Sequence, residues 1–302
     1  MTIAVVGGSG FIGTQLTRKL LALGDTVIVI DRVGPRFTHE HLFYIACDVA
    51  GKELPFDVLE HVDAVINLAG APISKKWTPA YKQEIYDSRI MSTRHVVQTM
   101  ERTTSRPTVL INASAVGYYG DRASEELTEK SQQGEGFLAR TVADWEQEAL
   151  KAESFGTRVV CVRTAPVVGH GGMLSELRKS ARFGFLLRLT NKSFWQAWIH
   201  EDDIVNTYLF ALQTSTVQGP INAAAPEMLT HRTFMQTLGK ALRRPVIGAL
   251  PRFVRRVLFG ELISELTASQ KVSPQRLIDK GFVFMYPTLV EAITQATTHE
   301  AN

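Results

Sequence analysis

Three glycines near the start of the chain have the spacing of a diphosphate-binding turn. Gly7, Gly10 and Gly13 follow the pattern G-x-x-G-x-x-G, directly between an apolar run and a helical repeat of leucines. The first glycine allows a tight turn, the second lets a diphosphate approach the backbone, and the third lets helix and strand pack closely. The N–H groups of the helix N-terminus then face the phosphates. We therefore predict that a nicotinamide dinucleotide binds to Gly7, Ser9, Gly10, Phe11, Ile12 and Gly13.

Two neighbouring charged residues after the second apolar run bear on which dinucleotide binds. Asp31 would accept hydrogen bonds from the adenosine ribose hydroxyls and repel a 2′-phosphate, which favours NAD. Arg32 could instead bind that phosphate, which leaves NADP open. Asp31 is also compatible with a simple role in a turn at the strand end.

Further cofactor contacts are expected where the third and fourth apolar runs end. Asp48 lies where a carboxylate can meet the adenine amino group, although a solvated turn residue is equally compatible. Leu68, Ala69 and Gly70 close the fourth run, where small residues let the chain pass close to the cofactor ribose. An ordinary turn is the alternative for this segment.

Three hydroxyl-bearing residues are the catalytic candidates. Ser114 follows the fifth apolar run, and Tyr118 and Tyr119 lie in the next loop. Ligands of open parallel sheets bind beyond the carboxyl ends of the strands, so all three are expected to face the substrate. Ser114 would then polarise a substrate oxygen, and a tyrosine would transfer a proton. The alternatives are a serine that satisfies nearby backbone and tyrosines that only pack.

Two cationic side chains are candidate substrate contacts. Arg163 follows the sixth apolar run and would contact the substrate or form a structural ion pair. His200 would shuttle protons or hold a loop in place. The eight histidines are scattered along the chain, so no metal site is predicted.

The elements that must position these residues alternate between strand and helix. Apolar runs predict strands over 3–6, 27–30, 44–46, 64–68, 109–111 and 159–162, with helices over 12–23, 79–100 and 137–153 between them. This alternation predicts an α/β fold, a doubly wound parallel Rossmann sheet with a smaller C-terminal lobe. The domains expected are a dinucleotide-binding domain over 1–168, to which segments near 199–225 return, and a substrate lobe over 169–302.

Composition narrows the class of partner. The 302 residues carry 33 basic and 30 acidic side chains, a balance that argues against nucleic acid or a membrane surface as partner. We expect a cytoplasmic protein, because the first strand starts at Thr2 and no uncharged run approaches about 18 residues. The partner expected is a small-molecule substrate, and the protein is expected to be a monomer or homodimer. Cys47 and Cys161, far apart and in apolar stretches, are expected to be inert core thiols.

Motifs along nearly the whole chain resemble those of the extended short-chain dehydrogenase/reductase superfamily. Within it the chain is most similar to an atypical branch, the nucleoside-diphosphate-sugar epimerase-like family, which has its own C-terminal domain and some members labelled cell-division inhibitors. The resemblance rests on the glycine turn and on Asn67-Leu68-Ala69-Gly70, Pro72-Ile73, Trp77-Thr78, Ser88-Arg89, Ala113-Ser114-Ala115, Gly117-Tyr118-Tyr119-Gly120-Asp121, Arg163-Thr164, Trp198-Ile199-His200, Asp202-Asp203, Gln270-Lys271-Val272, Pro274 and Arg276-Leu277.

The chain departs from the superfamily at its usual catalytic pair. No tyrosine has a lysine four residues later, and the helix that normally carries Tyr-x-x-x-Lys reads Phe137-Leu138-Ala139-Arg140-Thr141. The resemblance implies an NAD(P)-dependent oxidoreductase or epimerase that acts on a hydroxylated substrate, with nucleotide sugars as one candidate class. The missing pair keeps a second class open: a non-catalytic dinucleotide-binding protein with a regulatory or interaction role.

Overall fold

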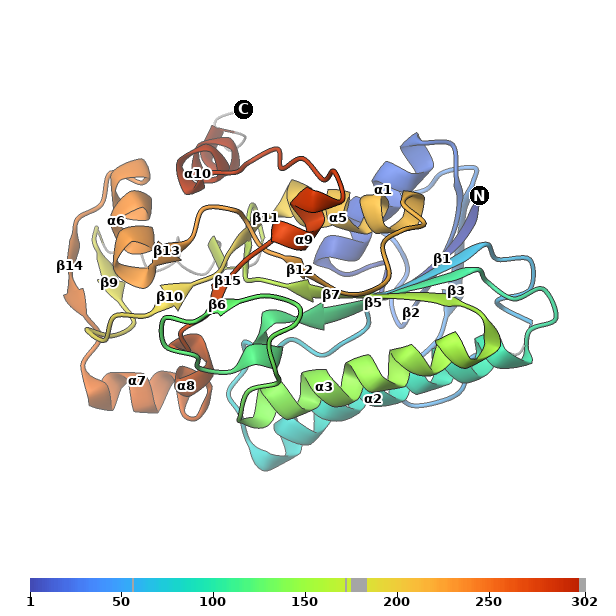
Figure 1. The fold of residues 1–302 in the computed structure, drawn as a ribbon, viewed down its shortest axis with the longest axis horizontal. Helices are drawn as coiled ribbons and strands as arrows, with labels where there is room; N and C mark the ends of the chain where they lie inside the picture. The colour runs from blue at the N-terminus through green and yellow to red at the C-terminus, as the bar shows by residue number, and fades with distance from the viewer. Residues whose placement is uncertain (56, 172, 175–183, 299–302) are drawn as a thin grey trace. The chain divides into compact units, whose positions relative to one another are not determined.

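The computed structural model describes residues 1–55, 57–171, 173–174 and 184–298 (Figure 1). Seven strands form one sheet in the order β12-β7-β5-β4-β1-β2-β3. Strand β1 pairs in parallel with β2 and β4, and parallel pairing continues from β2 to β3 and from β4 to β5. The strands are β1 (Thr2–Val6), β2 (Thr26–Asp31), β3 (Leu42–Ala46), β4 (Ala64–Asn67), β5 (Val109–Ala115), β7 (Arg158–Thr164) and β12 (Gly219–Ala223). The predicted Rossmann fold is confirmed.

Two helices that follow strands of this sheet begin at sequence signals. Helix α1 (Phe11–Ala22) follows the glycine turn, and α2 (Pro79–Arg102) is capped by Thr78, whose hydroxyl accepts a hydrogen bond from the Tyr81 N–H at 3.1 Å. Proline at the first position of α2 suits a site where its missing N–H is not needed.

The chain divides into two compact units. Unit 1 comprises 1–114, 141–163 and 205–221, and unit 2 comprises 115–140, 164–204 and 222–302. Segment 205–221 lies in unit 1 and segment 115–140 lies in unit 2; the domain boundaries expected from the sequence stay a prediction.

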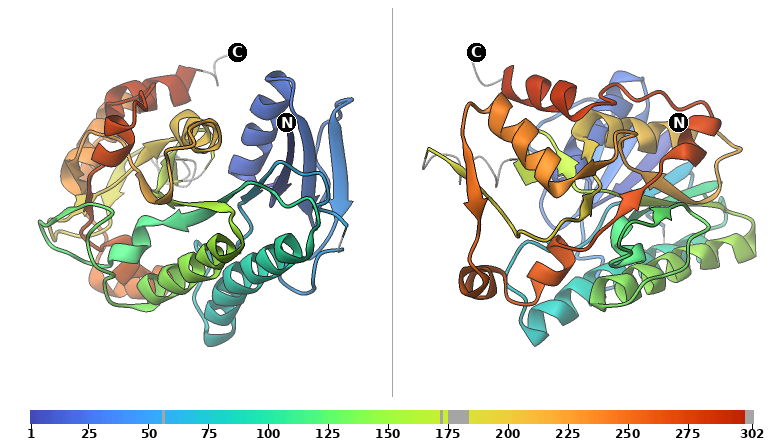
Figure 2. Two further views of the ribbon diagram at one scale, coloured as in Figure 1. Left: turned by 45° about the vertical axis from the view of Figure 1, so that its right-hand side comes forward. Right: turned by 60° about the vertical axis from the view of Figure 1, so that its left-hand side comes forward.

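Unit 1 holds most of the sheet and its core. Helices α2 and α3 (Phe137–Leu150) lie on one face of the sheet, and α1 and α5 (Glu201–Gln213) lie on the other (Figures 1 and 2). Buried apolar side chains such as Val65, Val96, Met100 and Val159 fill the layer under α2 and α3. Burial of this apolar surface is the main stabilising term for the layer.

Unit 2 has its own core, which is built around Trp198, Phe234 and Ile293. Its helices are α6 (His231–Ala241), α7 (Arg252–Phe259), α8 (Leu262–Leu266), α9 (Gln275–Asp279) and α10 (Leu289–Thr298). Its short strands are β6 (Glu126–Leu127), β8 (Val167–Val168), β9 (Leu186–Arg188), β10 (Trp195–Gln196), β11 (Ile199–His200), β13 (Leu229–Thr230), β14 (Val246–Ala249) and β15 (Lys271–Val272). Within the described residues, no helix is long and apolar enough to cross a membrane.

Candidate functional site

The glycine turn packs so tightly that side chains would not fit. Gly7 has a φ of +76°, and a Cβ on it would lie 3.0 Å from the Ala69 nitrogen. A Cβ on Gly13 would lie 2.4 Å from the Gly7 carbonyl oxygen, a distance that real Cβ contacts essentially never show. The turn is also held by the Gly10 N–H, which donates to the Gly7 carbonyl at 3.1 Å. The predicted reason for glycine at the first and third positions therefore holds in the structure.

The N-terminus of α1 directly after this turn is suited to an anion. Its N-cap is Gly10, no side chain caps the helix, and its first turn carries no acidic residue. The first N–H groups of a helix have no intrahelical partner, and the helix dipole places partial positive charge there. Phosphate oxygens can therefore accept hydrogen bonds from the backbone between Phe11 and Gly13.

Ser9 and Asp31 add polar groups to the same turn. The buried Ser9 Oγ has no hydrogen-bond partner in the part of the chain that the structure describes. The Asp31 carboxylate accepts hydrogen bonds from the Ser9 N–H at 3.1 Å and the Arg32 N–H at 2.7 Å. The Arg32 side chain is exposed. A buried hydroxyl without a partner beside a bare helix N-terminus fits a bound diphosphate.

A buried network fixes the backbone where β4 ends. The Asn67 amide nitrogen donates to Thr93 Oγ1 at 2.9 Å and to Asn112 Oδ1 at 2.7 Å, and its oxygen accepts from the Ala69 N–H. Trp145 Nε1 donates to the same threonine hydroxyl at 2.8 Å. The backbone of Leu68 and Ala69 lies directly against the glycine turn, since a Cβ on Gly7 would be 3.0 Å from both the Leu68 carbonyl carbon and the Ala69 nitrogen; the cofactor contact of this segment stays a prediction. No sequence signal pointed to the network, because its four side chains, those of Asn67, Thr93, Asn112 and Trp145, are 19 or more residues apart.

Asp48 is exposed at the start of a turn in which its carbonyl accepts from the Gly51 and Lys52 N–H groups, each at 3.0 Å. Its carboxylate is compatible with either sequence interpretation, so the adenine contact stays a prediction.

Ser114 lies in a buried charge network rather than alone. Its hydroxyl donates to Glu146 Oε1 at 2.5 Å, and Arg163 donates to both oxygens of that carboxylate at 2.8 Å. The side chains of Arg163 and Glu146 are only 3% and 7% exposed. These contacts support the structural ion pair that the sequence allowed for Arg163. Because its proton is donated to Glu146, Ser114 can accept a hydrogen bond from a substrate hydroxyl but cannot donate one to a carbonyl.

Glu146 is the member of this network that the sequence analysis missed. It lies on the face of α3 that also carries Val142, Trp145 and Ala149, all buried. A carboxylate among buried helix positions needs a partner, and this signal could have found the ion pair.

The two tyrosines differ in burial. Tyr119 is fully buried, and its hydroxyl donates to Asn222 Oδ1 at 2.6 Å. The Asn222 amide nitrogen in turn donates to the Leu127 and Ser273 carbonyls, so these contacts support packing for Tyr119 rather than proton transfer. Tyr118 is half-buried and packs edge-on against the Tyr119 ring.

His200 is held from both ring nitrogens. Its Nδ1 accepts from the Asp202 N–H at 3.1 Å, so its Nε2 carries the proton and donates to Gln295 Oε1 at 3.0 Å. The ring packs against Tyr286 with 3.9 Å between centroids, and burial lowers the histidine pKa. This arrangement supports the loop-fixing role that the sequence left open.

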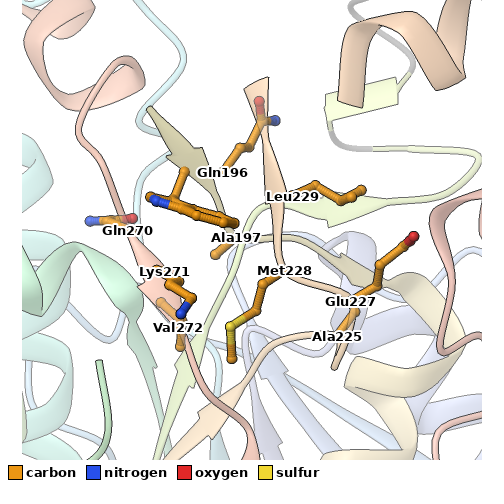
Figure 3. A pocket seen from close by; sticks show the side chains of 10 residues that line it. Gln196, Ala197, Ala225, Glu227, Met228, Leu229, Gln270, Lys271 and Val272 are labelled. Carbon is orange, nitrogen blue, oxygen red and sulfur yellow. The ribbon is translucent and has the colours of Figure 1, made fainter. Parts of the chain in front are cut away.

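Unit 2 also contains a small pocket of about 10 Å³, room for about one water molecule (Figure 3). It is lined by Trp195, Gln196, Ala197, Ala225, Glu227, Met228, Leu229, Gln270, Lys271 and Val272. Small-molecule sites usually measure roughly 300–1,000 Å³. The Lys271 ammonium is already paired with Glu126 at 3.2 Å. The pocket is therefore too small to define a substrate, and its lysine is already in an ion pair.

Comparison with known proteins shows the family. The model of the NAD dependent epimerase/dehydratase family matches residues 3–224. The chain belongs to this family. A second model, described as a domain of unknown function, matches residues 250–296. The resemblance drawn from the motifs is thus confirmed, including the separate C-terminal domain.

Named members of the epimerase family match nearly the whole chain. An epimerase family protein of Staphylococcus haemolyticus is 35% identical over 289 residues, which cover 94% of this chain and 95% of that protein. The chloroplastic SDR39U1 homolog of Arabidopsis thaliana is 35% identical over 300 residues, which cover 97% of this chain and 86% of that protein.

A solved human member of the epimerase family, SDR39U1 with NADPH, is 29% identical, with a TM-score of 0.86 over 98% of this chain and 99% of that one. A nucleoside-diphosphate sugar epimerase from Corynebacterium glutamicum is also 29% identical, with a TM-score of 0.78 over 99% of this chain and 58% of that one.

Proposed function

We propose that the chain binds NADP(H) at the glycine turn and uses it to exchange hydride with a hydroxylated, nucleotide-linked substrate. The observation that carries the proposal is the Ser9 hydroxyl, which has no partner among the described residues, beside the N-terminus of α1, which none of their side chains caps. Each is a hydrogen-bond donor group that a diphosphate would satisfy. Membership of a family described as NAD dependent supports a nicotinamide cofactor.

The preference for NADP(H) rests on the residues after β2. Each Asp31 oxygen accepts one backbone N–H in this turn and keeps a second lone pair for a ribose hydroxyl, so Asp31 alone does not decide between NAD and NADP. The exposed Arg32 side chain is then the group available for a 2′-phosphate. The human relative solved with NADPH supports the same choice.

The dinucleotide supplies the hydride acceptor or donor, and the chain must handle the proton. Ser114, with its own proton held by Glu146, is arranged to accept a hydrogen bond from a substrate hydroxyl. Half-buried Tyr118 is the proposed proton-transfer group, whereas the contacts of Tyr119 support packing. The Corynebacterium relative, described as a sugar epimerase, supports a nucleotide-linked substrate.

A second function, dinucleotide binding without catalysis, is favoured by one observation. The α3 positions that would carry the superfamily's tyrosine and lysine hold Phe137 and Thr141, and Thr141 is buried. Neither side chain can act as an acid or base near neutral pH. Such a protein would bind NADPH and convert no substrate.

Two measurements test the proposal. Fluorescence titration should show tighter binding of NADPH than of NADH, and Arg32→Gln should reduce that preference at least tenfold. Arg102→Gln, at the end of α2 and half exposed, is the control and should leave the preference unchanged. Equal affinities in the native protein would contradict the NADP(H) assignment.

Turnover is measured on nucleotide sugars and small carbonyl compounds with NADPH or NADP. Native activity that falls at least tenfold in Ser114→Ala, with NADPH affinity retained, supports the catalytic function. NADPH binding with no turnover on any of these substrates supports the second function.

A further inference from the structure

The side chain of Arg89 lies on the loop that follows β4. Its Nη1 donates to the carbonyls of Ala71 at 3.1 Å and Ile85 at 3.0 Å. A Cβ on Gly70 would lie 3.2 Å from the guanidinium carbon, so the guanidinium packs directly on the loop backbone. The guanidinium carbon also lies 5.2 Å from the centroid of the Trp145 ring. The guanidinium is therefore fixed in place and not a mobile surface group.

No carboxylate pairs with Arg89 among the described residues. Arg94, on the same helix, pairs with Glu148 at 2.8 Å. The Arg89 side chain is half-buried, and burial lowers its pKa to about 10, so the group stays charged at neutral pH. Its Nε and Nη2 groups donate to no residue that the structure describes. Neither nitrogen is among the fully buried polar atoms that lack a partner in the described chain, so an anionic ligand can reach both.

A purely structural role, in which Arg89 only holds the loop after β4, does not explain why this position carries a charge. Two other side chains of α2 already hold the same loop: Ser88 Oγ accepts from the Ala71 N–H at 2.9 Å, and the Tyr81 hydroxyl donates to the Pro72 carbonyl. Neutral side chains thus already hold this loop, and the positive charge of Arg89 is not needed to position it.

The position of this loop places Arg89 near the predicted phosphates. Strands β1 and β4 are parallel neighbours, so their carboxyl ends open at one edge of the sheet. The Ala69 nitrogen would be 3.0 Å from a Cβ on Gly7, and Gly70 is the next residue. Only this short loop therefore separates the guanidinium from the glycine turn.

We propose that Arg89 binds phosphate oxygens of a ligand at this edge, through its Nη2 and Nε groups. A planar guanidinium suits two-point recognition of phosphate. The phosphate would belong either to the dinucleotide or to the diphosphate of a nucleotide-linked substrate, and the proposal rests on the function proposed above.

The test compares Arg89→Gln with Arg102→Gln, a control on the same helix. Arg102 forms an exposed ion pair with Glu53, and such a pair contributes little to stability. Each variant is titrated with NADPH, and then with UDP after saturation with NADPH. Loss of a charge-assisted contact should weaken one of these ligands at least tenfold in Arg89→Gln and neither in Arg102→Gln. Weaker NADPH binding identifies the dinucleotide as the source, and weaker UDP binding alone identifies the substrate diphosphate.

Urea unfolding shows whether Arg89→Gln is folded. If it is not, Arg89→Lys replaces it, because lysine keeps the charge and loses the planar fork; a threefold weakening is then expected. A folded variant that binds both ligands within twofold of the native protein overturns the role of Arg89. A native protein that binds no NADPH instead overturns the proposed function, so the two failures are distinct.

Discussion

Replacing Glu146 by glutamine should strongly destabilise the protein, because Glu146 neutralises a buried arginine. The carboxylate accepts three hydrogen bonds, two from Arg163 and one from Ser114. Glutamine keeps the shape but turns one acceptor into a donor and removes the carboxylate charge that faces the guanidinium, which is 3% exposed. Removing one partner of a buried ion pair typically costs about 3–5 kcal/mol. That is a large fraction of the roughly 5–15 kcal/mol that stabilises an ordinary protein.

Urea unfolding measures this loss. Glu53→Gln is the matched control, since it breaks the Arg102–Glu53 pair, whose side chains are 50% and 58% exposed, and it should cost below about 1 kcal/mol. Replacing both Glu146 and Arg163 by methionine should recover part of the stability, because no unpaired charge remains. A loss below about 1 kcal/mol in Glu146→Gln would refute the view that this network is a buried structural element.

Three further predictions concern pH, a tyrosine and a glycine. Burial lowers the pKa of His231 to about 4, below the roughly 6.5 of an unfolded histidine. The contribution of the neutral ring to stability should therefore be complete above pH 6.5 and be lost as the pH falls toward 4. Across this range the unfolding free energy should fall less steeply with pH in His231→Gln than in the native protein. Tyr119→Phe removes the hydrogen bond to Asn222 and should lower the unfolding free energy by about 1–2 kcal/mol while NADPH affinity stays unchanged, and a loss of affinity instead would argue against the packing role. Gly13→Ala would press a methyl group against the Gly7 carbonyl, so a loss of about 3 kcal/mol or more in urea unfolding is expected, and a stable variant would disprove the tight packing of the turn.

The sheet was predictable because its strands are buried apolar runs. Every predicted strand is present within a few residues, and β4, buried at all four positions, begins with the apolar run Ala64–Ile66. Strand β12 (Gly219–Ala223) had no such signal, because its short sequence GPINA is not an apolar run. The chain's return to the sheet was expected only as a segment near 199–225.

The site was predictable where one local segment determines the geometry. The glycine turn is such a segment, since strand, turn and helix are contiguous between Thr2 and Ala22. Ser114 is the opposite case, because its role depends on a carboxylate 32 residues away whose position is set by the packing of α3. The direction of the Asp31 carboxylate likewise follows from tertiary contact with Ser9, 22 residues earlier.

The binding of NADPH by Ser9→Ala is the most direct test of the central claim, that the glycine turn is a cofactor site. The Ser9 hydroxyl has no partner among the described residues, so its removal should leave the unfolding free energy within about 0.5 kcal/mol of the native value. Affinity for NADPH should fall about five- to tenfold, the effect of one hydrogen bond. Thr17→Val, which removes another buried, unpartnered hydroxyl farther along α1, should leave the affinity unchanged. Unchanged affinity in Ser9→Ala would contradict the account.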